Sequence, residues 1–227
     1  MNWLFCFPYA GGNSTFYKEF KTKIKSVTVQ AFNYAGHSSR FCETQYNSPE
    51  DVIDDMIDLV LKKAKKDDTI FLLGYSMGAW VAYEVARKLT YTYDFHIKKI
   101  ILCAANAPGH HEEAIHELPQ SDFVNKLKEF GGMPEEVLQN KELLELVLPS
   151  IINDFRLCYE YTFDMNIPLL KCPIIAIHSD EELYANEWSQ YSSGKATVHH
   201  FEGNHFFILD KFDDTLQIIN DEITSEL

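Results

Sequence analysis

The pentapeptide Gly74-Tyr75-Ser76-Met77-Gly78 has the pattern G-x-S-x-G, in which a serine stands between two glycines. An apolar run at 69–73 precedes it, and a helical pattern starts at Met77. A strand followed by a sharp turn and a helix is the setting of a nucleophile elbow, which lifts a serine hydroxyl above a sheet. The new helix points its first backbone N–H groups toward a substrate carbonyl. Ser76 is therefore the candidate nucleophile and the Met77 N–H a candidate oxyanion donor, whereas the alternative is a serine in an ordinary turn.

A serine hydroxyl needs a base within hydrogen-bond reach, and nine histidines compete for that role. His205 lies in Glu202-Gly203-Asn204-His205, between the last expected strand and the last helix. Such a loop ends up at the carboxyl edge of a parallel sheet, beside the serine. We expect His205 to be the base, with His178 as its rival at a strand end. The remaining histidines are expected at the surface, in the core or in inserted helices: His37, His96, His110, His111, His116, His199 and His200.

A carboxylate should orient the imidazole, and Ser179-Asp180-Glu181-Glu182 directly follows the expected strand at 173–178. This gives the chain order serine, acid, histidine. Asp180 is the expected acid because a short carboxylate at the strand end is well placed, while Glu181 and Glu182 stay open as alternatives. The loop after the first strand, Phe7 to Gly12, should supply a second oxyanion donor, for which the N–H of Ala10 or a neighbour is the candidate.

Short apolar runs alternate with longer amphipathic stretches along the chain. Several runs are continuously apolar, which is typical of parallel strands covered on both faces. The strands are expected at 3–7, 27–32, 69–73, 99–104, 173–178 and 197–201. The helices between them are expected at 49–66, 77–89 and 209–223. Strands separated by helices predict an α/β protein with a mainly parallel, doubly wound sheet.

The segment 107–166 breaks this alternation, because it contains helical patterns at 121–130 and 141–154 and no convincing strand. About sixty residues far exceed an ordinary connection of about two to six. A helical lid inserted within one domain spanning 1–227 is therefore expected. Gly131-Gly132-Met133-Pro134 separates its helical pieces and Pro149 should interrupt the second one. Gly131 and Gly132 are a candidate hinge for substrate access.

Composition excludes several classes of protein. The 227 residues, 46% apolar and 24% charged, are enough for a folded core without metals or disulfides. A net charge of −14 argues against a nucleic-acid-binding surface. A membrane span and a signal peptide are not expected. Five scattered cysteines without C-x-x-C spacing argue against a zinc site or a disulfide framework and predict buried thiols in a reducing cytoplasm.

Several motifs together resemble the type II thioesterases of nonribosomal peptide and polyketide synthesis. Phe5 to Gly12 is similar to that family's F-P-x-A-G-G, and Gly74 to Ala79 to its G-H-S-M-G-A. Gly131 to Pro134 resembles a lid motif, Leu148 to Asp154 the pattern L-P-x-x-R-x-D, and Gly203 to Phe207 the pattern G-x-H-F-F/M. Three departures stand out: Tyr75 replaces a usual histidine, Ile152 a usual arginine, and 179–182 a usual G-x-x-D.

The resemblance implies an α/β-hydrolase fold and a serine thioesterase with Ser76, Asp180 and His205 as its triad. Such an enzyme removes acyl or aminoacyl groups from the 4′-phosphopantetheine arm of acyl or peptidyl carrier proteins, and it needs no cofactor. We expect it to act as a monomer. Two alternatives keep the same residues: a serine esterase or acyltransferase of this fold, and a non-catalytic module that binds carrier proteins.

Overall fold

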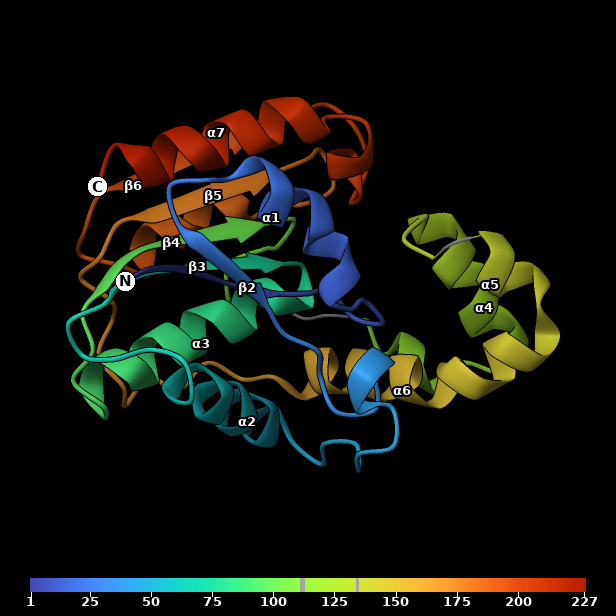
Figure 1. Cartoon of the computed structure of the whole chain (residues 1–227). Coiled ribbons are helices and arrows are strands. Elements are labelled where there is room, and N and C mark those ends of the chain that lie inside the picture. The colour runs from blue at the N-terminus through green and yellow to red at the C-terminus, as the bar shows by residue number, and fades with distance from the viewer. Residues whose placement is uncertain (111–112, 134) are drawn as a thin grey trace.

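A computed structural model of the chain describes residues 1–110, 113–133 and 135–227. His111 and Pro134, which were singled out above, lie outside these residues. Six parallel strands form one sheet in the order β2-β1-β3-β4-β5-β6 (Figure 1). They are β1 (Asn2–Phe7), β2 (Thr28–Ala31), β3 (Thr69–Tyr75), β4 (Ile97–Cys103), β5 (Ile174–His178) and β6 (Ala196–His200). The order places β3, which leads to Ser76, near the centre of the sheet.

Helices cover both faces of the sheet, as the alternating pattern predicted. They are α1 (Lys18–Lys23), α2 (Pro49–Leu61), α3 (Met77–Tyr91) and α7 (Phe212–Thr224). Side chains of α2 and α3 pack with Phe5 and Phe7 of β1 in one buried cluster, and those of α1 and α7 pack with Leu4 and Cys6 in another. Successive β1 residues thus face opposite helix layers, which explains why the strand is apolar throughout.

Local sequence accounts for the start of α2. Ser48 accepts a hydrogen bond from the Asp51 N–H, while Asp51 accepts one from the Ser48 N–H, and Pro49 occupies the first helical position. This reciprocal pair satisfies backbone groups that a helix start would leave without partners. The helix ends at Leu61 rather than at residue 66, because the segment after it turns back toward β3.

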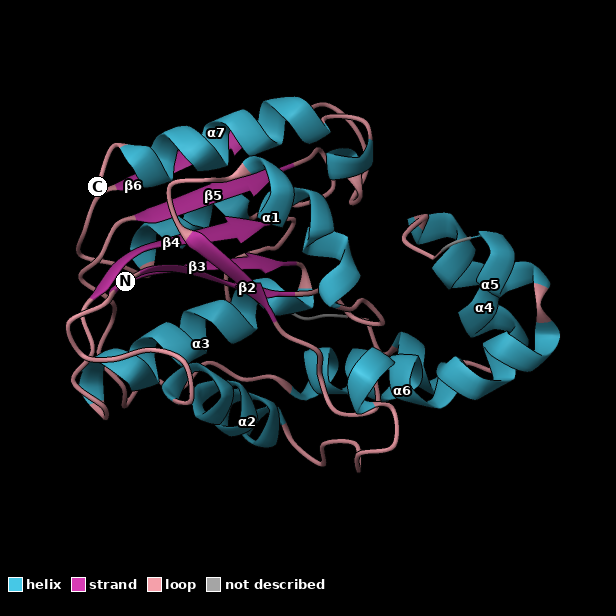
Figure 2. Cartoon of the chain, in the orientation of Figure 1, coloured by secondary structure: helices cyan, strands magenta, loops and turns pink. Residues whose placement is uncertain are grey.

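The segment between β4 and β5 is helical, and its described residues contain no strand before an isolated bridge at Leu170 (Figure 2). We call α4 (Gln120–Phe130), α5 (Glu135–Gln139) and α6 (Lys141–Glu160) the inserted helices. They extend beside the edge of the sheet to which the strand ends point (Figure 1). Phe123, Leu127, Leu148 and Ile151 form the centre of their own small core.

The expected break at Pro149 is wrong, because α6 runs through it. A proline in a helix leaves the carbonyl four residues earlier without its partner. Both Pro149 and Glu145 are exposed, so water can hydrogen-bond to that carbonyl.

Short 3-10 turns are the remaining helical elements: η1 (Ser14–Tyr17), η2 (Ser38–Arg40), η3 (Ile115–Glu117), η4 (Ala185–Gln190) and η5 (Phe207–Leu209). No helix in the described ranges has the length and apolar character to cross a membrane.

Candidate active site

Ser76 occupies a strained turn between β3 and α3, with φ 55° and ψ −118°. A non-glycine residue in such a conformation costs on the order of 1–3 kcal/mol, which the surrounding structure must offset. A Cβ at Gly74 would lie 1.9 Å from the Gly78 carbonyl oxygen, and one at Gly78 would lie 2.0 Å from the Phe7 carbonyl oxygen. Both glycines of the G-x-S-x-G pattern are therefore required by close backbone approach.

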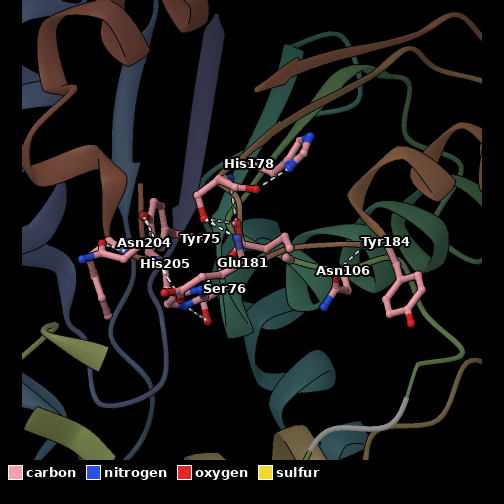
Figure 3. Close-up of polar contacts among 12 residues, drawn as sticks. Tyr75, Ser76, Asn106, His178, Glu181, Tyr184, Asn204 and His205 are labelled. Atoms are coloured by element: carbon pink, nitrogen blue, oxygen red, sulfur yellow. Dashed lines mark hydrogen bonds and ion pairs between the residues drawn. The ribbon is translucent and has the colours of Figure 1, made fainter. Parts of the chain in front are cut away.

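Ser76, His205 and Glu182 form a continuous hydrogen-bonded chain. Figure 3 shows the side chains of Ser76 and His205 next to each other. His205 Nε2 lies 2.9 Å from Ser76 Oγ, and His205 Nδ1 lies 2.8 Å from Glu182 Oε1. With Nδ1 donating to the carboxylate, Nε2 is free to accept the serine proton. The arrangement can therefore turn a neutral hydroxyl into a nucleophile.

The expectation that Asp180 contacts the histidine side chain is corrected, because the carboxylate at His205 Nδ1 belongs to Glu182. Asp180 is exposed, and its oxygens bind His200 Nε2 at 2.8 Å and the Gly203 N–H at 2.9 Å. The reason is the loop conformation. The Ser179 N–H and hydroxyl both donate to Glu182 Oε2 at 2.8 Å, which turns the third acid of the run inward.

Glu182 is buried, at 4% exposed, yet its pKa is lowered. Burial by itself opposes the charged form, but the contact with His205 and the two Ser179 donors outweigh it. Glu181, the middle acid, accepts the His205 backbone N–H at 2.9 Å. All three acids of 180–182 thus bind the loop 203–205, which holds His205 over the serine.

Tyr75, which stands where the resembling family has histidine, contacts the same loop. Its hydroxyl donates to the His205 carbonyl oxygen at 2.6 Å, and its ring stacks on Phe206 with centroids 5.9 Å apart. The rival histidine, His178, is buried with Nδ1 2.8 Å from the Ser179 carbonyl oxygen and its ring beside His200. Sequence reasoning missed the Tyr75 contact, because a tyrosine at a motif position gives no signal of its partner.

The two expected oxyanion donors border the same cavity. Ala10 and Met77 line it together with Ser76 and His205. Met77 is the first residue of α3, where backbone N–H groups have no partner within the helix. Next to Ala10, the N–H of Gly11 already donates to Asp154 at 2.7 Å.

The cavity has a volume of about 1050 Å³ and reaches from Ser76 to the inserted helices. Its apolar wall includes Trp80 and Tyr161, whose rings stack with centroids 4.6 Å apart. Leu127, Phe130 and Met133 line the side toward the inserted helices.

The side chains of Glu181, Glu182 and His205 are close enough together to hold a metal ion. Both acids, however, accept hydrogen bonds from His205, and these bonds account for the cluster.

A parallel sheet with a serine on a strained β3–α3 turn, a histidine after β6 and an acid after β5 defines a serine hydrolase of the α/β-hydrolase type. The thioesterase domain family model matches residues 2–223, so the chain belongs to that family. Enzymes of this family hydrolyse thioester bonds. Because the chain belongs to the family and has Ser76 beside His205, it is a serine thioesterase.

Known proteins similar to this chain span nearly its whole length. Linear gramicidin dehydrogenase LgrE of Brevibacillus parabrevis is 30% identical, covering 99% of this chain and 88% of LgrE. The word dehydrogenase describes LgrE only. The assignment of this chain as a thioesterase rests on the family match. The type II thioesterase BorB from the borrelidin biosynthetic cluster is 27% identical, with a TM-score of 0.86 over 97% of this chain and 91% of BorB. ClbQ from the colibactin NRPS/PKS pathway is 25% identical, with a TM-score of 0.90 over 99% of this chain and 97% of ClbQ.

Proposed function

We propose that this protein is an editing thioesterase of a nonribosomal peptide or polyketide synthase. It hydrolyses acyl or aminoacyl thioesters from the 4′-phosphopantetheine arm of acyl or peptidyl carrier proteins. The observation that carries the proposal is the Ser76–His205–Glu182 chain at a large, partly apolar cavity. The similarity to BorB and ClbQ supports the choice of pathway.

The first half-reaction transfers the acyl group to the enzyme. Ser76 Oγ attacks the thioester carbonyl while His205 Nε2 takes the hydroxyl proton, and Glu182 stabilises the resulting imidazolium. The N–H groups of Met77 and Ala10 hold the developing oxyanion. His205 then gives the proton to the departing pantetheine sulfur, which leaves an acyl ester on Ser76.

The second half-reaction releases the acid. Water takes the place of the thiol, His205 removes one of its protons, and the hydroxide equivalent attacks the acyl ester. Collapse of the second oxyanion returns the proton to Ser76 Oγ. No metal or organic cofactor is required by these steps.

The cavity supports a substrate with a flexible arm and an apolar acyl group. The stacked rings of Trp80 and Tyr161 form part of the apolar lining of the cavity that contains Ser76. We propose that the inserted helices act as a lid, because Leu127 and Phe130 of α4 and Met133, between α4 and α5, line the cavity. The lid must open far enough for a carrier protein to deliver its arm.

Hydrolysis of three substrates tests the proposal: an acyl group on carrier-protein pantetheine, the same acyl group on coenzyme A, and a p-nitrophenyl ester. We expect kcat/KM for the carrier-bound thioester to exceed both others by about tenfold or more, since binding energy from the remote carrier is available in the transition state. A preference for the simple ester would favour the esterase or acyltransferase alternative. Failure of a fluorophosphonate probe to label Ser76 would favour the non-catalytic binding module.

The Gly131-Gly132 segment gives a second test. A Cβ at Gly132 would lie 1.9 Å from the Phe206 ring, and the Tyr9 hydroxyl donates to the Gly132 carbonyl oxygen at 3.0 Å. Gly132→Ala should therefore displace Phe206 and the adjacent His205, lowering kcat about tenfold or more on carrier-bound and small substrates alike. Steady-state kinetics on both substrates measure this.

Gly131→Ala is the matched control, because a Cβ there meets nothing within 4 Å. Its φ of 77° makes the alanine cost about 1 kcal/mol of stability, with little change in kcat. A loss for Gly132→Ala confined to carrier-bound substrate would instead support the hinge expected from the sequence.

We further propose that the protein acts as a monomer in the cytoplasm. Within the part of the chain that the structure describes, none of the five cysteines is joined in a disulfide, which agrees with a reducing compartment. Sedimentation of the purified protein tests the oligomeric state.

A further inference from the structure

Asp154 of α6 has contacts that the catalytic chain does not explain. It ends the segment that resembles L-P-x-x-R-x-D, and it is buried at 1% exposed. Its Oδ2 accepts the Gly11 N–H at 2.7 Å. An ionised carboxylate is expensive to bury without partners, so such a position calls for a specific role.

His37 supplies the second partner of this carboxylate. Its Nε2 lies 3.0 Å from Asp154 Oδ2, while its Nδ1 faces the Ala35 carbonyl oxygen at 3.2 Å. Burial lowers the pKa of His37, but the attraction and contact of Asp154 outweigh this, and the net pKa is raised. The imidazole of His37 thus faces the buried carboxylate directly.

The Gly11 N–H is the point at which Asp154 acts on the active site. Gly11 directly follows Ala10, whose N–H is the proposed second oxyanion donor. Gly11 has φ 77°, and a Cβ there would lie 3.1 Å from the Ile151 side chain, one turn before Asp154 on α6. The same helix therefore comes so close to the loop that a side chain at Gly11 would crowd Ile151, and it holds the loop by the hydrogen bond from the Gly11 N–H to Asp154.

We propose that Asp154 is a positioning residue that fixes the oxyanion loop through the Gly11 N–H. The inference rests on the proposed role of Ala10. Oxyanion donors stabilise a transition state only when they are held at the right distance before reaction. Because Asp154 belongs to an inserted helix, the oxyanion loop is set by the same element that covers the cavity. If α6 moved away from the loop, the Gly11 N–H would lose its bond to Asp154, and the Ala10 N–H would no longer be held in place to bind the oxyanion.

Asp154→Ala and Asp154→Asn separate positioning from general stability. Alanine removes the acceptor, whereas the asparagine carbonyl can still accept the Gly11 N–H. We expect Asp154→Ala to lower kcat for a p-nitrophenyl ester about tenfold to a hundredfold with KM within about twofold, and to slow phosphonylation of Ser76 by a fluorophosphonate by the same factor. Asp154→Asn should recover most of both rates.

Asn153→Ala is the control on the same helix. Asn153 anchors α6 elsewhere, since its Nδ2 donates to the Tyr46 carbonyl oxygen at 3.2 Å. It should keep kcat close to that of the unchanged protein. Equal losses for Asn153→Ala and Asp154→Ala, or no loss for Asp154→Ala, would overturn the proposal.

The Gly11 amide gives a readout that does not depend on activity. In NMR spectra it should be shifted downfield and exchange slowly with solvent in the unchanged protein and in Asp154→Asn. If Asp154→Ala does not fold, slow exchange in these two proteins supports the contact, and a fast-exchanging Gly11 amide in the unchanged protein overturns it. An unchanged protein that phosphonylates normally but ignores carrier-bound thioester would contradict only the proposed function.

Discussion

Replacing Ser76 with alanine is expected to lower kcat on carrier-bound thioester by about 10⁴-fold or more. Serine hydrolases that lose the nucleophile lose a factor of this order, and the activity that remains comes from the oxyanion donors and binding. The alanine keeps the Cβ of serine, so the strained φ of 55° costs the same and the fold should be retained. Single-turnover hydrolysis of an acylated carrier protein gives the rate.

Ser189→Ala is a suitable control, because Ser189 is exposed and its hydroxyl bonds only the Asn186 carbonyl oxygen among the described contacts. It should leave kcat unchanged. Circular dichroism of both variants checks that they fold. Turnover by Ser76→Ala within tenfold of the unchanged protein would remove the serine from the mechanism.

The nucleophile turn could be predicted from the sequence because its determinants are local. An apolar strand, two glycines and a helix start lie within a few residues of Ser76, and close packing requires both glycines. The parallel sheet was predicted for the same reason, and the six expected strands differ from those in the structure by two residues or fewer at each end. Continuous apolar runs carry the information that both faces are covered.

The acid could not be assigned from the sequence because three consecutive carboxylates follow β5. Which one faces His205 depends on how the loop turns, and that is set by the Ser179 donors and by the loop 203–205. Asp180 is closest to the strand end but points to His200 and Gly203. The order of serine, acid and histidine along the chain places the acid in this loop, but it does not distinguish among the three carboxylates.

Contacts between residues far apart in the chain could not be predicted from the sequence either. The Asp154 carboxylate meets Gly11, 143 residues earlier in the chain, and the Tyr75 hydroxyl meets the His205 carbonyl 130 residues later. Each residue type fits many surroundings, and only the fold brings the partners together. The expected helix break at Pro149 was wrong because the sequence does not tell whether this part of the helix is exposed. Exposure decides how much free energy the missing helix hydrogen bond costs.

Glu182→Gln is expected to lower kcat by about 10³- to 10⁴-fold while Asp180→Asn stays within about tenfold of the unchanged protein. In serine hydrolases an amide in place of the orienting carboxylate costs about 10⁴, since it favours the wrong histidine tautomer and cannot stabilise the imidazolium. Glu182 is buried against His205 Nδ1, whereas Asp180 is exposed. Steady-state hydrolysis of carrier-bound thioester compares the two variants.

The same pair differs in its effect on acid stability. The pKa of Glu182 is lowered in the folded protein, so its carboxylate contributes stability above the pKa of an unfolded glutamate, and this is lost as pH falls through the lower folded value. Glu182→Gln should remove that part of the pH dependence of the free energy of unfolding, as measured by urea titration between about pH 3 and 7. Asp180→Asn matching or exceeding the kcat loss of Glu182→Gln would return the orienting role to Asp180. The opposite ranking, together with a flatter acid stability profile for Glu182→Gln, would establish Glu182 as the acid of the triad.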